Sequence, residues 1–194
     1  MNLYQASFLN SVREYPNNTA LYTEENSGKA NISSAKTFTY KKLFELSQQW
    51  GDYIAHFNKQ QSPVAIYGGR QWQMYAGILA VLSTNSAYVP LNNKQPVARN
   101  SKVLSQIDCQ VLLVAENEDP LALLQLTKRS LTVIYLGSDT PKWLSKKGHH
   151  TFVKMVDTNS AVPPSNTRTI AAQLHEADIK LNTTVMPFIL RGVK

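Results

Sequence analysis

Cysteine is nearly absent from this sequence: Cys109 is the single one in 194 residues. No internal disulfide can form, so a hydrophobic core must hold the fold, and a chain of this length can bury one. Cys109 lies beside the apolar run 111–114, and no pattern of His with Asn or Asp marks it as a nucleophile. Because free cysteine is frequently buried, we interpret Cys109 as a core side chain.

Segments that direct a chain into or through a membrane are also missing. Residues 1–5 lack the basic start and apolar stretch of a secretion signal. The longest apolar run, around residues 76–82, is far shorter than the roughly 20 residues that cross a bilayer. We therefore expect a cytoplasmic protein with no membrane partner.

Negative charge is scarce, because 13 Asp and Glu stand against 20 Lys and Arg, which gives a net charge of +7. Such a balance raises nucleic acid or an anionic surface as a partner. The basic residues are scattered, however, and the one dense cluster, 146–150, lacks the interleaved aromatics of a single-strand platform. We interpret this cluster as a solvated turn and do not favour nucleic acid as a partner. Its adjacent His149 and His150 are not at zinc-ligand spacing, so no metal site is expected.

Apolar periodicity predicts alternating elements along the chain. Residues 8–15 indicate a short helix, followed by a hairpin with strands at 20–23 and 36–39. From Tyr40 to Asn58 one apolar stripe recurs at helical spacing, and Thr39 can cap that helix. The remaining predicted elements are strands at 64–67, 87–91, 110–115, 131–136 and 151–156, and helices at 70–84, 95–108 and 119–127.

Short apolar strands separated by helices are typical of a parallel sheet with both faces covered. We therefore predict an α/β fold: a mostly parallel sheet with helices on both faces, and a short N-terminal hairpin. Pro90 should place the strand 87–91 at an edge or an end of the sheet. We assign residues 1–157 to this domain. Residues 158–194 are assigned to a loop-rich tail, in which 170–176 could hold one or two helical turns.

Three segments, in this order, resemble the adenylate-forming (AMP-binding) superfamily, which includes acyl-CoA synthetases, firefly-type luciferases and the amino-acid-activating domains of peptide synthetases and D-alanyl carrier-protein ligases. The first segment places Thr39 and Tyr40 at a helix start, with Lys42 where the family has the Glu of a capping box. The second is the strand 64–67 with the helix after it. There Asn85 replaces the terminal Gly of the family, and Asn can adopt the same left-handed conformation.

The third segment is the most specific. Amino-acid-activating members carry Ala-Tyr-Val-Pro, an aliphatic residue and Asp, and then Tyr-Pro-x-x-Arg. The residues that carry the match here are Ala87, Tyr88, Val89, Pro90 and Arg99. Asn92 stands in place of the Asp and Gln95 in place of the Tyr. The resemblance covers about residues 8–115 and implies the N-terminal part of an amino-acid-adenylating domain.

The resemblance also implies parts that these residues do not contain. In the family, a Ser/Thr/Gly-rich loop ending in Pro-Lys-Gly holds the ATP phosphates, and its glycines let backbone amides approach them. No such loop follows residues 177–179, and neither the ribose-binding Asp nor the catalytic Lys of the family is found. Intact relatives use ATP and Mg²⁺ to activate a carboxylate. For this chain alone we expect no cofactor, no metal and no catalytic residue, and we interpret it as cut short or frame-shifted near Ile179.

Two other interpretations stay open. The chain could be half of a split enzyme, completed in trans by a chain that carries the missing subdomains. It could also be a binding or scaffold module, in one version a basic nucleic-acid binder whose affinity would fall steeply with salt.

One turn is a candidate for a retained small-molecule site. Open α/β sheets bind ligands outside the carboxyl ends of their strands, and the turn Tyr67-Gly68-Gly69-Arg70 follows the strand 64–67. Its two glycines and one guanidinium suit an anion. The alternative is a tight turn that uses glycine for its conformation alone, followed by an exposed Arg.

Overall fold

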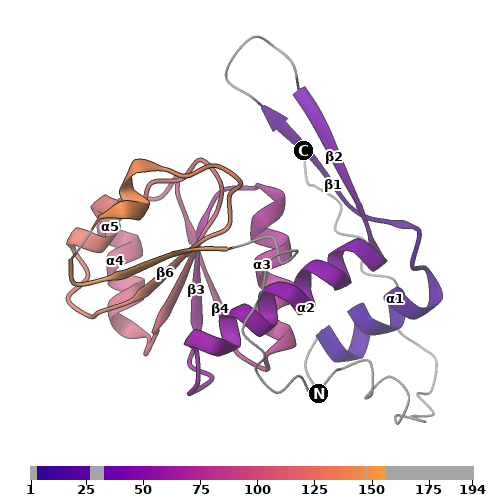
Figure 1. Cartoon of the computed structure of the whole chain (residues 1–194), viewed down its shortest axis with the longest axis horizontal. Coiled ribbons are helices and arrows are strands. Elements are labelled where there is room, and N and C mark those ends of the chain that lie inside the picture. Colours follow the sequence, from indigo (N-terminus) through magenta and orange to yellow (C-terminus); the bar gives the residue numbers. More distant parts are fainter. Residues whose placement is uncertain (1–3, 27–32, 147, 156–194) are drawn as a thin grey trace.

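The computed structural model describes residues 4–26, 33–146 and 148–155, and places an α/β body beside a projecting hairpin (Figure 1). The helices are η1 (Tyr4–Phe8, a π-helical turn), α1 (Leu9–Glu14), α2 (Tyr40–Phe57), α3 (Trp72–Ser83), α4 (Val97–Gln106), α5 (Leu121–Gln125) and η2 (Lys142–Ser145, a 3₁₀ turn). The strands are β1 (Thr19–Asn26), β2 (Ser33–Thr39), β3 (Val64–Gly68), β4 (Tyr88–Asn92), β5 (Val111–Val114), β6 (Thr132–Tyr135) and β7 (Thr151–Lys154). The predicted alternation of strands and helices is confirmed.

The central feature is a parallel five-stranded sheet in the order β4-β3-β5-β6-β7. Pro90 lies in β4, opposite Ile66 of β3. Proline has no N–H to donate to a second neighbour, which suits a strand that pairs on one side only. The predicted edge position of this strand is confirmed.

The central strands β3 and β5, and most of β6, are buried on both faces because helices cover both (Figure 1). Successive side chains point to opposite faces, so Leu113 of β5 packs with α2 and α3, and its neighbour Leu112 packs with α4 and α5. Both leucines have no exposed surface. Cys109 belongs to the second core at 1% exposure, and burial raises the pKa of its thiol, as expected of a packing residue.

Two predicted helix ends are confirmed in atomic detail. The Thr39 hydroxyl accepts the Lys42 backbone N–H at 3.2 Å, so α2 keeps its N-cap although no Glu completes a capping box. Asn85, just after α3, has a φ of 58°, the left-handed conformation expected of it. Gly51 lies where α2 crosses α3, and a Cβ there would collide with the Ser83 hydroxyl.

The antiparallel hairpin β1–β2 projects away from the sheet (Figure 1). An isolated two-stranded hairpin is marginally stable in water. Here Phe38 stacks on Trp72 at the start of α3 with ring centroids 4.9 Å apart, and the Lys36 ammonium lies 5.6 Å from the same indole. These contacts join the base of the hairpin to the body of the domain.

Some boundaries differ from the predicted ones. The helix predicted from Arg70 begins at Trp72, because Gly69 and Gln71 form a turn first. The π-helical turn of η1 was not predicted. The predicted tail 158–194, including 170–176 and the segment around Ile179, lies outside the described residues. Within the described ranges, no helix combines the length and apolar character that crossing a bilayer requires.

Candidate functional site

The predicted turn Tyr67–Arg70 lies at the carboxyl end of β3, where open α/β sheets bind ligands. Tyr67 is buried and Arg70 is exposed. Burial, with Glu118 and Asp119 nearby, raises the pKa of the Tyr67 hydroxyl. The turn also touches the next strand, since Asn93 after β4 donates its backbone N–H to the Gly68 carbonyl at 3.1 Å.

Close packing accounts for Gly68. A Cβ at this position would lie 2.8 Å from the Cβ of Ala115 and 2.9 Å from the sulfur of Met74. Both distances are shorter than side-chain atoms tolerate, so the end of β3 can approach β5 and α3 only without a side chain. This contact favours a packing role for the glycine.

The Gly69 amide is already engaged within the domain. It donates to Gln71 Oε1 at 2.7 Å, and Gln71 Nε2 donates in turn to Glu118 Oε1 at 2.6 Å. The Asn93 side chain donates to the same carboxylate oxygen at 2.7 Å. Three loops at the carboxyl edge of the sheet therefore meet at Glu118.

Glu116, two residues after β5, is the centre of a second cluster. It accepts hydrogen bonds from the Ser138 N–H at 3.0 Å, the Ser138 hydroxyl at 2.6 Å and Gln73 Nε2 at 2.9 Å. Burial raises the pKa of Glu116, but the bonds from Ser138 and Gln73, with the charge of Lys36, outweigh it, and the pKa lies below its ordinary value. Glu116 is therefore an ionised carboxylate that joins the loop after β6 to α3.

These contacts decide what chemistry the edge can offer. Within the described part of the chain, Gln73 Oε1 and Asn93 Oδ1 are buried acceptors without a hydrogen-bond partner. An edge with two carboxylates and two open acceptors does not fit the phosphates of ATP, which need donors and positive charge. The contacts favour the structural interpretation of Gly68 and Gly69. Anion binding at Arg70 stays a prediction.

The chain contains one Pro-Lys pair, Pro141-Lys142, and it does not form a glycine-lined loop. Trp143 follows it, buried, with its indole N–H donated to the Glu118 carbonyl at 3.2 Å. Tyr135, the last residue of β6, donates a hydrogen bond from its phenol to the Asp139 carboxylate in the same loop. Burial and this bond raise the pKa of Tyr135 far above its ordinary value.

The residues that carry the family resemblance lie in three places. Thr39 and Tyr40 begin α2. The run Ala87–Pro90 leads into and along the edge strand β4, and the Ala87 carbonyl accepts the Val64 N–H at 2.8 Å. Arg99 lies exposed on α4, where its guanidinium donates to Gln95 at 3.1 Å. These residues shape the sheet and its helices; the contacts that the structure gives them do not bring them together at one site.

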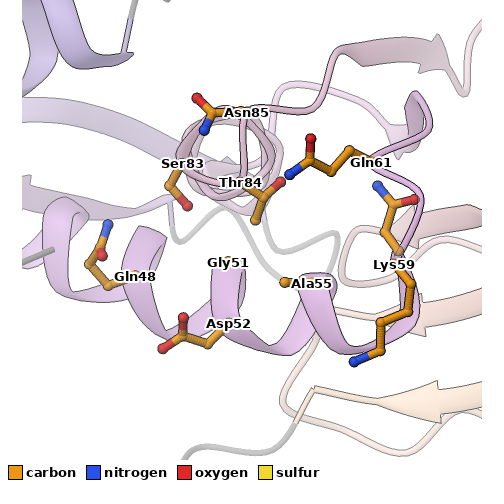
Figure 2. Close-up of a pocket in the computed structure, with 10 residues that line it drawn as sticks. Gln48, Gly51, Asp52, Ala55, Lys59, Gln61, Ser83, Thr84 and Asn85 are labelled. Atoms are coloured by element: carbon orange, nitrogen blue, oxygen red, sulfur yellow. The ribbon is translucent and has the colours of Figure 1, made fainter. Parts of the chain in front are cut away.

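Glu116, Glu118 and Ser138 belong to this edge but were not predicted from the sequence as its members. A signal was present, because the first polar residue comes two residues after the end of β5 and three residues after the end of β6. Also not predicted was a groove of about 310 Å³ at the opposite end of the domain, between the C-terminal ends of α2 and α3 (Figure 2). Amide, hydroxyl and charged side chains line the groove: Gln48, Asp52, Lys59, Gln61, Ser83 and Asn85.

The groove has no arrangement of groups suited to catalysis. Figure 2 shows Asp52 pointing away from the end of α3, with Lys59 further along the chain. Elsewhere in the described residues, no group of three or more His, Cys, Asp or Glu side chains could hold a metal ion.

Comparison with known proteins gives a consistent result. A family model described as "AMP-binding enzyme" matches residues 8–177. Tyrocidine synthase 3 of Brevibacillus parabrevis is 31% identical over 110 residues, 53% of this chain and 2% of that protein. Bacitracin synthase 3 of Bacillus licheniformis is 30% identical over 113 residues, 55% of this chain and 2% of that protein. The chain thus spans only a few per cent of the length of such relatives.

Solved structures resemble the chain in fold. The Vibrio cholerae adenylation domain AlmE, solved with glycyl-adenosine-5'-phosphate, superposes with a TM-score of 0.62 at 22% identity, over 80% of this chain and 28% of that one. IdnL7 gives a TM-score of 0.56 at 23% identity, over 79% of this chain and 28% of that one. At these identities the likeness concerns the fold alone.

Proposed function

This chain belongs to the AMP-binding enzyme family across residues 8–177, and we propose that it is the N-terminal sheet subdomain of an adenylate-forming enzyme that does not form an acyl-adenylate by itself. Enzymes of this family join a carboxylate to ATP, with Mg²⁺, and release pyrophosphate. The supporting observation is the carboxyl edge of the sheet. There the Gly69 amide is bonded to Gln71, and Glu116 and Glu118 supply carboxylates where phosphates would need donors.

The 194 residues also contain no Pro-Lys-Gly sequence, with which the phosphate-holding loop of the family ends. Electrostatic stabilisation by oriented donors is the main protein contribution to phosphoryl chemistry. Without these donors the chain can supply part of the fold and of the contact surface of an adenylating enzyme. It can neither bind the phosphates of ATP nor align the α-phosphate for reaction. The cytoplasmic location expected from the sequence stays a prediction.

An ATP–pyrophosphate exchange assay tests the proposal. The purified chain is incubated with ATP, Mg²⁺, labelled pyrophosphate and a mixed pool of amino and fatty acids, beside an intact adenylation domain as the positive control. We expect exchange in the control and none above background with the chain. Acyl-AMP formed by the chain unaided, or tight ATP binding in equilibrium dialysis, would contradict the proposal.

A second candidate is a chain completed in trans, and the edge strand β7 favours it. Thr151 and Met155 donate their N–H groups to the carbonyls of Leu131 and Tyr135, on β6 and its flank, at 3.0 and 2.8 Å. Alternate residues of a parallel strand face opposite neighbours, so Phe152 directs its N–H and C=O away from β6. No strand of the described residues pairs there. An open edge of this kind accepts a further strand.

Complementation is tested with a separate polypeptide that carries the Ser/Thr/Gly-rich loop and the remaining subdomains of an adenylation domain. If the two chains form one enzyme, they co-purify, pyrophosphate exchange appears only in the mixture, and hydrogen exchange slows at the Phe152 amide. If the chain stays a stable monomer and does not bind the second polypeptide, this candidate is excluded and the first proposal still holds.

A further inference from the structure

The edge strand β7 begins next to a histidine that bonds to two other elements. His150, directly before β7, accepts the Leu131 N–H at its Nδ1 over 3.3 Å, and its Nε2 lies 3.3 Å from the Leu124 carbonyl of α5. The next residue, Thr151, donates its N–H to the Leu131 carbonyl at 3.0 Å. Leu131 therefore holds the start of β7 through both its N–H and its carbonyl.

This arrangement requires the neutral form of the His150 ring. Nδ1 accepts a hydrogen bond only when it carries no proton, and Nε2 then carries the proton that it donates to the Leu124 carbonyl. A second proton, on Nδ1, would place an N–H against the N–H of Leu131. The charged ring and the bonded start of β7 therefore exclude each other.

The surroundings of the ring do not compensate a positive charge. The charged and titratable side chains of the adjoining loops and of β7 are His149, Lys128, Arg129, Asp108 and Lys154. The one carboxylate among them, Asp108, pairs with Arg129 at 3.1 Å, and α5 has no titratable residue. Burial lowers the pKa of His150, the bond to the Leu124 carbonyl raises it by less, and the charge of His149 lowers it again. The ring therefore takes up a proton more readily once it has left these contacts.

The other end of β7 is held by contacts that involve no histidine. Met155 donates its N–H to the Tyr135 carbonyl at 2.8 Å, and the Lys154 carbonyl accepts the hydroxyl of Tyr53, on α2, at 3.3 Å. The Lys154 ammonium donates to the Ser138 carbonyl at 2.6 Å. Within the described residues β7 pairs only with β6. Its first residues can therefore leave the sheet without breaking a second ladder.

We propose that His150 is a pH-sensitive switch whose protonation releases the first residues of β7 from β6, while the end of the strand stays paired. In the released state the ring is a histidine of ordinary pKa, about 6.5, which falls in the range where histidine senses pH. Because the bonded state binds the proton less readily, acid favours release. Between pH 7.5 and 5.5 the opening equilibrium should rise roughly three- to tenfold, since tenfold is the limit for a bonded state that binds no proton.

Amide hydrogen exchange of the full chain, followed by NMR at pH 7.5 and 5.5 and corrected for the intrinsic exchange rate, tests the proposal. The opening constants of the Leu131 and Thr151 amides should rise roughly three- to tenfold on acidification. Their exchange should depend little on urea up to about 1 M, because local release exposes little surface. The Met155 and Leu136 amides, at the end of β7 and after β6, should stay more strongly protected and exchange with a clear dependence on urea.

Two variants identify the titrating group. His150→Gln keeps an acceptor and a donor but does not titrate, so the rise on acidification should disappear. The control His149→Gln can still donate to the Lys128 carbonyl and should keep the rise. In the unaltered chain, the NMR titration of the His150 ring should have the same midpoint as the opening of Thr151, which tests the switch without any substitution.

Four results would overturn the proposal. The first is no increase in opening of the Leu131 and Thr151 amides at pH 5.5, and the second is a urea dependence equal to that of Leu136, which would mean global unfolding. The third is a rise that persists in His150→Gln, and the fourth is a ring titration whose midpoint differs from that of the opening.

Discussion

The two edges of the parallel sheet use their charged residues differently. At the carboxyl edge, Glu116 and Glu118 each accept several hydrogen bonds from neighbouring loops, and Lys154 donates to a carbonyl. At the amino edge, Lys128 in the loop before β6 is exposed and lacks an ion-pair partner among the described residues. The two carboxylates of the carboxyl edge therefore join the loops of the fold, whereas the Lys128 ammonium at the amino edge is not part of such a network.

This difference matters because ligands of open α/β sheets bind at the carboxyl edge. In this chain that edge is closed by its own hydrogen bonds, and its carboxylates oppose a phosphate ligand. Substitution of the bonded carboxylates at the carboxyl edge should therefore lower stability, and substitution of the exposed Lys128 and Lys146 should leave it nearly unchanged.

The largest expected effect is that of Glu116→Ala. It removes the acceptor of three hydrogen bonds and leaves Gln73, at 1% exposure, without a partner. We expect a loss of about 2–3 kcal/mol in the free energy of unfolding, because orphaned buried donors and bonds to a charged acceptor carry costs of this order. Urea unfolding with an unchanged m-value measures it. The exposed control Glu45→Ala, on α2, should cost less than about 0.5 kcal/mol.

The dependence of stability on acidic pH tests the same role of Glu116. The folded-state pKa of Glu116 is lowered, so its contribution to stability is complete above the unfolded value of about 4.3 and is lost as the pH falls through the folded value. Glu116→Gln should flatten the stability profile below about pH 4.3. An unchanged profile would show that Glu116 does not join the loops as the structure indicates.

Gly68→Ala should have the next largest effect. The added Cβ would meet Ala115 at 2.8 Å and Met74 at 2.9 Å, and only the methionine can move aside easily. Overpacking of this kind costs about 1–2 kcal/mol. Gly148→Ala is the matched control in the amino-edge loop, where a Cβ would have no neighbour within 4 Å. Equal melting temperatures for the two variants would contradict a packing role for Gly68.

The sequence sufficed for the fold because its local signals agreed with one another. The alternation of short apolar strands with helices predicted the parallel sheet, Pro90 predicted its edge, and Thr39 and Asn85 predicted two helix ends. Each of these features depends on backbone geometry or on burial, which a few neighbouring residues determine.

The site was less predictable because its members are far apart in the sequence. The turn Tyr67–Arg70 was predicted from the position of its glycines. The hydrogen bond that occupies its Gly69 amide comes from Gln71, which is bonded in turn to the distant Glu118. The loops at the amino edge of the sheet show the same limit. The sequence placed the cluster 146–150 in a solvated turn, but the neighbouring Lys128 and Arg129 join it only through the order of β5, β6 and β7.

A smaller effect is expected from His150, which connects the loop before β7 to the core. Its Nδ1 accepts the Leu131 N–H and its Nε2 lies 3.3 Å from the Leu124 carbonyl, an arrangement that requires the neutral ring. Burial lowers the pKa of His150, and the charge of His149 adds to this. The unfolded chain therefore binds a proton more readily, and stability should fall as the pH drops below about 6.5, the unfolded value.

Melting temperatures at pH 7.5 and 5.5 measure this dependence. His150→Gln should reduce the loss of stability between the two pH values, since Gln does not titrate. His56→Gln, an exposed histidine of α2, should behave as the unaltered chain does. If both variants lose as much stability on acidification as the unaltered chain, the folded domain does not require a neutral His150.

The smallest change in stability should follow Lys128→Gln/Lys146→Gln. Neither ammonium has an ion-pair partner among the described residues, so the free energy of unfolding should stay within about 0.5 kcal/mol of the original value. Any shift should be a gain, because the chain has a net charge of +7 and removing two positive charges lowers its self-repulsion. Salt should distinguish the proteins, since ions screen exposed charges over about 10 Å at 0.1 M. Added salt should stabilise the unaltered chain more than the variant. A loss of more than about 1 kcal/mol would mean that these lysines support the fold, and the contrast between the two edges would fail.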